Sequence, residues 1–391
     1  MKQILCLSTS NYYPVPTRKQ NIMNRLTDCS VIYVDPPVTI IAPIKDPKAK
    51  DRVNAYKVGG QISKEYPHVK YYAQPPVLPF FNKRRGINEI NQKRFAKYLA
   101  DIVTQNNFDP DHFILWCYSP TSCDVVAPLA RALGVDSAGL WARTVYDCVD
   151  RHSAYPGLID PKVVDEQEED LARSAKYVFA TADGLYDRLK EYNSNARMVP
   201  NGANYPLFST VQKLKAGSKE QPIFGFVGAL QECTDYDFIR AIASAFPNDK
   251  VQLIGRALPG VDLSWIKNYA NIELHPPVPQ SELPEYIKNF DVCLNCFADN
   301  DLSKDVSPLK FYEYLATGKP VLSTPVPLQV RTFEECIYIV ETPEELKTQC
   351  LAALNEPEDS PRRAMRIEAA KHCSWDERVK EIRTYLDFME G

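Results

Sequence analysis

Residues 307–321 read SPLKFYEYLATGKPV, and this stretch combines the signals for the start, the faces and the end of one helix. Ser307 is a favoured N-cap, and Pro308 suits the first helical position because its missing N–H would find no partner there. The glycine near the end of the stretch should terminate the helix. Lys310 and Glu313 lie three residues apart, so they share one face near the N-terminal end.

This helix is expected to bind an anionic ligand. Its buried stripe consists of Phe311, Tyr314 and Leu315. The free amides at the helix start attract an anion, Lys310 adds positive charge, and Glu313 could accept hydrogen bonds from two ribose hydroxyls. Apolar runs at 290–295 and 320–324 flank the helix, which places its start where parallel α/β sheets bind ligands. Taken alone, the pattern also fits an amphipathic helix with a solvated Lys–Glu pair.

The segment resembles the donor-site signature of GT-B glycosyltransferases, especially family 4 and the related teichuronic-acid and capsule enzymes. The resemblance implies that Glu313 holds the donor ribose. The neighbouring donor-site residues that it implies are Ser307, Pro308, Leu309 and Lys310. The family's second glutamate corresponds to Asp305, a shorter carboxylate, in this chain.

A second similarity lies at 226–230, FVGAL, which is similar to the first loop of the family's donor domain. A small residue there, Gly228, lets the backbone approach a diphosphate; a plain tight turn is the alternative. Family members usually carry arginine and then lysine after this strand, and this chain has neither. The phosphate charge is therefore expected to be met by Arg256 and Lys310.

The fold class predicted from the whole chain is α/β. Short apolar runs, among them 3–7, 144–147 and 250–254, alternate with helical segments in both halves, which predicts parallel sheets. A chain of 391 residues suits two domains. The resemblance implies the GT-B architecture, with two Rossmann-like domains whose parallel sheets face each other across a cleft. The expected parts are an acceptor-side domain at 1–208, a linker at 209–221, a donor domain at 222–373 and a final helix at 374–391 that crosses back to the first domain.

Two segments of the N-terminal half carry candidate polar residues. Arg18 and Gln20 follow Thr17, which is expected to be an N-cap, and this segment resembles the first helix of the same enzymes, where an arginine and a glutamine lie at the cleft. The resemblance implies that Arg18 and Gln20 contact the acceptor or a phosphate, and the phosphate near Arg18 could belong to the donor or to a lipid-linked acceptor. A solvated surface arginine is the alternative. Asp147, Asp150 and His152 follow an apolar strand and are candidates for the base of an inverting transferase. A retaining enzyme could use the leaving diphosphate instead, and the two aspartates could equally serve to order a loop.

Residues 77–85, VLPFFNKRR, place an apolar wedge beside three cations. Anionic lipid headgroups attract such clusters, so peripheral membrane contact is expected through Phe80, Phe81, Lys83, Arg84 and Arg85. An ordinary solvated helix with an aromatic core anchor is the alternative. No run reaches the ~18 apolar residues of a membrane span, and the predicted location is the cytoplasm, with the inner face of the cell membrane left open.

Composition excludes several other classes of protein. The 46 basic and 50 acidic residues give a net charge of −4, so no nucleic acid partner is expected. Cys293 and Cys296 have metal-site spacing but lie in a strand pattern without a second ligand pair. No metal or other cofactor is expected, in keeping with GT-B enzymes generally, and the nucleoside diphosphate sugar is the substrate.

The sequence therefore predicts a glycosyltransferase that moves a sugar from a nucleoside diphosphate donor, with UDP favoured, to a surface polysaccharide or lipid-linked glycan. Two alternatives stay open. A UDP-sugar epimerase of the same fold would use cleft histidines, and the chain has only five histidines. A non-catalytic nucleotide-sugar binding scaffold subunit would fit the missing Arg–Lys pair.

Overall fold

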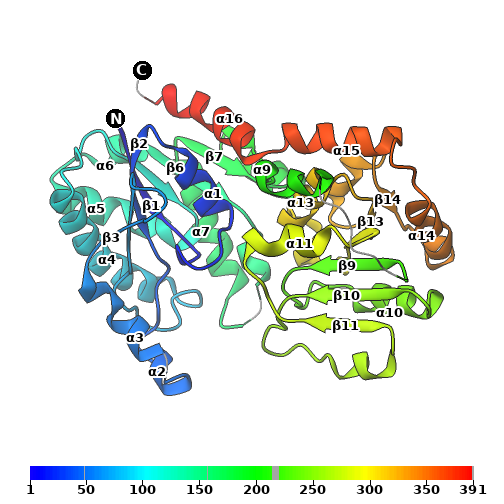
Figure 1. Cartoon of the computed structure of the whole chain (residues 1–391). Coiled ribbons are helices and arrows are strands. Elements are labelled where there is room, and N and C mark those ends of the chain that lie inside the picture. Colours follow the sequence, from blue (N-terminus) through cyan, green and yellow to red (C-terminus); the bar gives the residue numbers. More distant parts are fainter. Residues whose placement is uncertain (48, 156, 214–219, 390–391) are drawn as a thin grey trace. The chain divides into compact units, whose positions relative to one another are not determined.

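The computed structural model describes residues 1–47, 49–155, 157–213 and 220–389, which form two units, each with its own sheet (Figure 1). The N-terminal unit comprises Met1–Val199 and Val379–Gly391, and the C-terminal unit comprises Pro200–Arg378. Of the predicted linker at 209–221, residues Ser209–Lys213 form a 3-10 turn (η4), and 214–219 lie outside the described residues.

The N-terminal unit is built on an eight-stranded sheet of order β3-β4-β2-β1-β5-β6-β7-β8. Its strands are β1 (Lys2–Leu7), β2 (Cys29–Val34), β3 (Gln61–Ile62), β4 (Val69–Tyr72), β5 (Ile114–Cys117), β6 (Thr144–Cys148), β7 (Tyr177–Ala180) and β8 (Ala196–Met198). Neighbouring strands run parallel, as predicted, except that β3 pairs antiparallel with β4.

Helices cover this first sheet and bury a continuous apolar core. They are α1 (Arg18–Arg25), α2 (Ala42–Lys45), α3 (Ala49–Asn54), α4 (Arg85–Gln105), α5 (Val126–Leu133), α6 (Ser137–Trp141), α7 (Pro161–Ser174) and α8 (Asp183–Leu189), with 3-10 turns η1 (Ala55–Val58), η2 (Pro120–Asp124) and η3 (His152–Ala154). Local signals set their ends. Asp160 accepts a hydrogen bond from the backbone N–H of Lys162 at the start of α7, and Gly134 ends α5 in the left-handed conformation.

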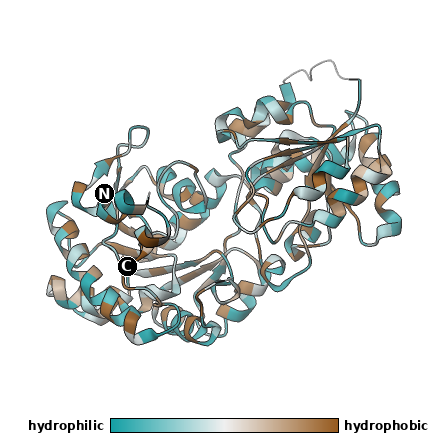
Figure 2. Ribbon diagram, turned by 90° about the horizontal axis from the view of Figure 1, so that it is seen from below, coloured by the Kyte–Doolittle hydropathy of each residue, from teal (hydrophilic) through white to brown (hydrophobic). Residues whose placement is uncertain are grey.

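The C-terminal unit is built on a six-stranded sheet of order β11-β10-β9-β12-β13-β14, whose strand pairs are parallel. The strands are β9 (Ile223–Val227), β10 (Lys250–Ile254), β11 (Ile272–His275), β12 (Val292–Asn295), β13 (Val321–Ser323) and β14 (Tyr338–Ile339). Figure 1 shows β9, β10 and β11 side by side. The inner strands β5, β6, β9 and β12 are buried along their whole length, as expected of strands covered on both faces, and hydrophobic colour runs along both sheets in Figure 2.

The helices of the C-terminal unit complete its two covering layers. They are α9 (Tyr205–Phe208), α10 (Tyr236–Ala245), α11 (Leu283–Ile287), α12 (Asp301–Lys304), α13 (Leu309–Thr317), α14 (Leu346–Leu354) and α15 (Pro361–His372), with η5 (Ser264–Asn268), η6 (Gln280–Glu282), η7 (Leu328–Phe333) and η8 (Pro343–Glu345).

The last helix, α16 (Trp375–Asp387), spans the boundary between the two units. Its C-terminal part packs within the N-terminal unit, where Arg383 pairs with Asp28 at 2.6 Å. The ring of Tyr385 lies 5.6 Å from that of Phe179 on β7. Over the described parts of the chain, no helix is long and apolar enough to cross a membrane.

Candidate functional site

Two glycine turns shape the carboxyl edge of the second sheet. Gly228 follows β9 with φ +139°, and Gly255 follows β10 with φ +155°. A Cβ atom on Gly255 would lie 1.9 Å from the carbonyl oxygen of Gly228, so no larger residue fits without moving the backbone. The two strand ends therefore approach each other closely, and the half-buried backbone of both turns lies at the carboxyl edge of the sheet.

Helix α13 begins at Leu309, one residue later than predicted, and its N-cap is Pro308 in an extended conformation. The prediction that Ser307 caps this helix is wrong. The Ser307 hydroxyl instead accepts a hydrogen bond from the backbone N–H of Asn201 at 3.1 Å, and its carbonyl accepts one from the Asn201 amide at 2.6 Å. The serine thus anchors the segment before the helix.

The rest of the helix follows the prediction. Gly318 ends it in the left-handed conformation, and the stripe of Phe311, Tyr314 and Leu315 is buried. The Tyr314 hydroxyl accepts a hydrogen bond from the backbone N–H of Val227 at 2.7 Å. This bond ties the middle of α13 to the last residue of β9, directly before Gly228.

Lys310 lies at this junction of helix and glycine turn. Its Nζ atom lies 3.7 Å from the ring centroid of Phe226 and 5.2 Å from that of Phe297. A Cβ atom on Gly228 would come within 3.3 Å of Nζ, so the ammonium group borders the half-buried backbone of the turn. Burial lowers the pKa of Lys310 to about 8. No carboxylate of the described residues forms an ion pair with this cation, so an anion could take that place.

Glu313 lies one turn further along the same helix and is 8% exposed. Its Oε1 atom accepts a hydrogen bond from the side-chain amide of Gln280 at 2.7 Å. Burial raises the pKa of Glu313 to about 8, against the opposing effects of Gln280 and Lys310. Sequence reasoning missed Gln280, because it lies in a short turn 33 residues before Glu313 and no local pattern connects the two.

The remaining predicted donor-site residues lie in the same unit, after the carboxyl ends of its strands. Arg256 directly follows Gly255 and is exposed. Asp305 directly follows α12 and is half-buried. The structure thus brings Lys310 and Gly228 together, with Glu313 one helical turn away and Arg256 next to the second glycine turn.

In the N-terminal unit, Arg18 and Asp147 form a buried ion pair. The Arg18 Nε–H donates to Asp147 Oδ1 at 2.9 Å and to Oδ2 at 3.1 Å, and the side chains are 2% and 0% exposed. Burial raises the pKa of Asp147, and the guanidinium opposes this shift. In this arrangement the carboxylate at the end of β6 faces Arg18.

Lys19, which sequence reasoning did not single out, is buried beside this pair. It is 8% exposed, and its Nζ atom lies 5.5 Å from the ring centroid of Tyr118. Burial lowers the pKa of Lys19, while Asp150 and Asp147 act to raise it. No sequence signal could have found it, since one of two adjacent helical cations usually points to solvent.

Asp150 and His152 lie in the segment that follows β6. Asp150 accepts a hydrogen bond from the Tyr155 hydroxyl at 2.6 Å. His152 is 9% exposed, and its Nε2 atom has no hydrogen-bond partner among the residues that the structure describes. Burial lowers the pKa of His152, so the imidazole is neutral at pH 7, and its Nε2 atom is an acceptor that is buried from solvent and unpaired within the described ranges.

The Gln20 side chain forms hydrogen bonds with nearby residues at the start of α1. Thr17 is the N-cap of α1, as expected, and its backbone N–H donates to Gln20 Oε1 at 2.8 Å in a capping box. The Gln20 amide donates to the carbonyl of Asn11 at 2.6 Å. The side chain therefore orders the loop between β1 and α1.

The aromatic and basic segment at 77–85 is split by the fold. Phe80 is 45% exposed and Lys83 and Arg84 are exposed, whereas Phe81 is half-buried. Arg85 pairs with Asp124 at 3.1 Å and with Asp170 at 2.6 Å. Two of the three predicted cations thus point to solvent, and the third is held by the protein.

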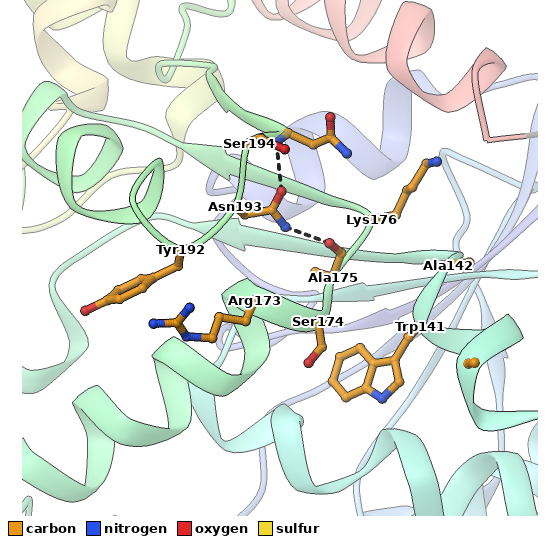
Figure 3. Close-up of a pocket in the computed structure, with 11 residues that line it drawn as sticks. Trp141, Ala142, Arg173, Ser174, Ala175, Lys176, Tyr192, Asn193 and Ser194 are labelled. Carbon is orange, nitrogen blue, oxygen red and sulfur yellow. Dashed lines mark hydrogen bonds between the residues drawn. The ribbon is translucent and has the colours of Figure 1, made fainter.

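A pocket of about 520 Å³ lies at the opposite edge of the first sheet, next to the residues that precede β6 and β7 (Figure 3). Figure 3 shows Trp141, Arg173 and Tyr192 around it, and the Asn193 amide donates to the carbonyl of Ala175 at 2.7 Å. Ligands of parallel α/β sheets bind at the carboxyl ends of the strands, and this pocket lies at the amino ends. It contains none of the predicted site residues.

Within the described ranges, no group of three or more His, Cys, Asp or Glu side chains is arranged to hold a metal ion. The eleven cysteines are free thiols, and Cys293 and Cys296 are buried.

Comparison with known proteins connects this geometry to a family. Residues 234–384 match the family model described as "Glycosyl transferase-like". A protein of Bacillus subtilis (strain 168) that is named for teichuronic acid biosynthesis, glycosyltransferase TuaH, is 24% identical over 265 residues, which are 63% of this chain and 67% of the relative.

Solved structures share the fold along the whole chain. Sucrose-phosphate synthase (tll1590) from Thermosynechococcus elongatus superimposes with a TM-score of 0.69 at 13% identity and covers 100% of this chain and 99% of its own. Anabaena Alr3699/HepE in complex with UDP-glucose gives a TM-score of 0.67 at 12% identity, over 99% of this chain and 100% of its own. The C-terminal unit thus matches a glycosyltransferase-like family model, and the chain as a whole shares the fold of GT-B enzymes over its full length.

Proposed function

We propose that the enzyme transfers a sugar from a UDP-sugar to a growing surface polysaccharide or lipid-linked glycan. The observation that carries this proposal is the half-buried Lys310 ammonium beside the half-buried backbone of Gly228, with Glu313 one turn away. A cation, free amides and a carboxylate in this order match a diphosphate followed by a ribose. The match of residues 234–384 to a glycosyltransferase-like family model supports a transferase over the epimerase and the scaffold subunit.

The uridine nucleotide is supported by solved relatives of the same fold. HepE was solved with UDP and with UDP-glucose, and an E. coli trehalose-6-phosphate enzyme was solved with UDP-2-fluoro glucose. The polysaccharide acceptor is supported by the name of the Bacillus subtilis relative, which refers to teichuronic acid biosynthesis.

In the donor site we assign Lys310 and Arg256 to the diphosphate, Gly228 to its close backbone contact and Glu313 to the ribose hydroxyls. The donor sugar would lie near Asp305, and residues Ser307, Pro308 and Leu309 would line the approach to the helix. During transfer the bond between the anomeric carbon and the diphosphate oxygen breaks, and negative charge develops on the leaving diphosphate. Lys310 and Arg256 stabilise this charge, so the proposal requires no metal ion.

On the acceptor side, a new bond forms between the acceptor hydroxyl oxygen and the anomeric carbon, and the hydroxyl proton must leave. Neutral His152 and the neighbouring Asp150 are the groups that we assign to accept it. We assign Asp147 to holding Arg18 in place, while Lys19 is a second buried cation beside Asp147 and Asp150. We further propose that the enzyme works in the cytoplasm at the inner face of the cell membrane, which exposed Phe80, Lys83 and Arg84 would contact.

The proposal is tested by binding and slow hydrolysis of a panel of nucleoside diphosphate sugars. Wild type, Lys310→Met and Glu313→Gln are compared by calorimetry and by release of UDP. Lys371→Met and Glu368→Gln are matched controls, because these residues form an exposed pair with the same spacing on α15 at 2.8 Å. We expect a UDP-sugar to bind and to release UDP, with both processes weakened by the first two variants only.

Other results would count against the proposal. Conversion of the UDP-sugar into another UDP-sugar without release of UDP would indicate an epimerase. Binding without any turnover, even with candidate acceptors present, would indicate a scaffold subunit. No binding at millimolar concentration would refute the donor site itself.

A further inference from the structure

We propose that a pocket at the carboxyl edge of the first sheet binds the hydrocarbon chain of a phosphate-linked lipid acceptor. The pocket has a volume of about 490 Å³, which is within the usual range for small-molecule sites. Its walls are largely apolar and include Ile41, Ala42, Phe80, Phe81, Leu158 and Ile159. This inference rests on the proposed transfer to a lipid-linked glycan and specifies the part of the acceptor that is recognised.

The pocket lies on the same sheet edge as the candidate acceptor groups. One wall follows β2 and β4, where the backbone N–H of Ile40 donates to the carbonyl of Val77 at 2.9 Å. The other wall, Leu158 and Ile159, belongs to the segment that starts with Asp150 and His152 after β6. The backbone N–H of Asp160 donates to the carbonyl of Asn82 at 3.0 Å and joins the two walls. A lipid whose hydrocarbon chain is held here would keep its head group at the carboxyl edge of the first sheet, where Asp150 and His152 lie.

Several large apolar side chains in or next to the pocket walls are exposed to solvent. Exposure is 47% for Ile40, 83% for Ile44 and 51% for Leu158, and these residues lie in or next to the two walls. Contiguous exposed apolar side chains mark binding surfaces. A long apolar ligand would cover them, whereas a free sugar or a nucleotide would not.

Phe80 shows the clearest sign of a functional constraint. It is 45% exposed and has φ +67°, a conformation that bulky residues rarely adopt. The backbone N–H groups of Lys83 and Arg84 both donate to its carbonyl, at 2.9 and 3.0 Å, and hold the turn. Strained backbone is concentrated at ligand sites, and here the strained turn presents an aromatic ring at the pocket.

The charges around the pocket suit a phosphate. Arg52 lines the pocket, and exposed Lys83 and Arg84 follow Phe80. None of these three cations forms an ion pair with a residue that the structure describes. Asp46 also lines the pocket and contributes one negative charge. An apolar chain with a phosphate head satisfies both the walls and the unpaired cations, which a neutral lipid would not do.

The first test uses single-chain phosphates that stay monomeric. Binding of inorganic phosphate and of butyl, hexyl and octyl phosphate to the full chain is measured by calorimetry. Each buried methylene should tighten binding about fourfold, so octyl phosphate, with four more methylenes, should bind about 250-fold more tightly than butyl phosphate. No dependence on chain length would overturn the inference.

Variants separate the wall from the head-group site. Ala42→Trp should fill the pocket and abolish the dependence on chain length, while Ala55→Trp, at a half-buried alanine of the adjacent turn, should leave it unchanged. Arg52→Gln should weaken every alkyl phosphate by a similar factor and keep the dependence on chain length, with Lys57→Gln as control. Unchanged chain-length dependence in Ala42→Trp would also overturn the inference.

Two further readouts identify the source of a failure. UDP-sugar binding is measured on the same preparations, so loss of donor binding would count against the proposed function, whereas intact donor binding with no chain-length dependence would count against the pocket alone. Sedimentation with phosphatidylglycerol vesicles tests a plain membrane surface. Vesicle binding that Arg52→Gln weakens, without binding of octyl phosphate, would show a membrane-docking face and refute an acceptor pocket.

Discussion

Replacing Lys310 by methionine should weaken UDP binding roughly 10- to 150-fold. A phosphate oxygen against the backbone of Gly228 would lie within about 4 Å of the ammonium, where two unit charges interact by about 4 kcal/mol at an effective dielectric of 20. Part of this energy offsets the loss of hydration, and hydrogen bonds to charged groups contribute about 1.5–3 kcal/mol net. Methionine has a similar length and keeps the contacts with the Phe226 and Phe297 rings.

The pH dependence of binding gives this prediction a second, independent part. The pKa of Lys310 is lowered to about 8 and that of Glu313 is raised to about 8, in both cases mainly by burial. A rise in pH through 8 therefore removes a positive charge and adds a negative one on the same face of α13. Both changes disfavour an anion, so UDP affinity should fall as pH rises from 7 to 9.

Calorimetric titration of UDP at several pH values between 6.5 and 9.5 measures both parts. Each single variant, Lys310→Met or Glu313→Gln, should keep only a fraction of the pH dependence, and the double variant should show almost none. UDP binding by Lys310→Met within twofold of wild type at pH 7 would refute the assignment of this cation to the diphosphate. Equal pH dependence in wild type and double variant would refute the assignment of the titrating groups.

Three further predictions concern other parts of the two units. Gly255→Ala should abolish detectable UDP binding, because the new Cβ atom would lie 1.9 Å from the Gly228 carbonyl oxygen. Gly260→Ala is the control, since Gly260 also has a positive φ of +93° but no atom within 4 Å of an added Cβ. Equal UDP affinity in the two variants would contradict this prediction. Arg18→Met should lower the free energy of unfolding by about 3–5 kcal/mol, because it leaves Asp147 buried without its ion-pair partner. Adding Asp147→Asn to this variant should restore part of the loss, and urea unfolding measures both free energies. If the losses caused by the two substitutions simply add in the double variant, the two residues are not coupled. His152→Asn should reduce the rate of transfer about 10²- to 10⁴-fold and leave UDP binding unchanged, with His275→Asn as the control. Because burial lowers the pKa of His152, the wild-type rate should stay high as the pH is lowered to 6.5 and below. A wild-type rate that already falls when the pH is lowered to 7 would argue against this base.

Much of the fold could be predicted from the sequence because its strands are short apolar runs bounded by polar residues. The runs at 3–7, 144–147 and 250–254 correspond to β1, β6 and β10 within one residue at each end. The antiparallel pairing of β3 was not predicted, because a two-residue strand with exposed side chains carries no periodic signal.

The site was predictable only where its residues lie close together in the chain. The pattern of 307–321 correctly indicated the buried stripe and the glycine that ends α13. It misplaced the cap, because Asn201, about a hundred residues upstream, binds the Ser307 hydroxyl and no local rule includes that competitor. Gln280 and Lys19 were missed for the same reason, since their importance depends on burial by distant segments.

The hydrogen bond from Val227 to Tyr314 has a consequence for how the donor site can vary. Because this bond joins the end of β9 to helix α13, it fixes the position of the Gly228 turn relative to Lys310. A substitution at Tyr314 would displace the cation relative to the turn, although the tyrosine itself lies outside the nucleotide contacts that we assign. A loss of UDP affinity in Tyr314→Phe would thus report the altered position of Lys310 relative to the Gly228 turn, and not a lost contact with the nucleotide. Attempts to change donor preference should therefore leave Tyr314 unchanged.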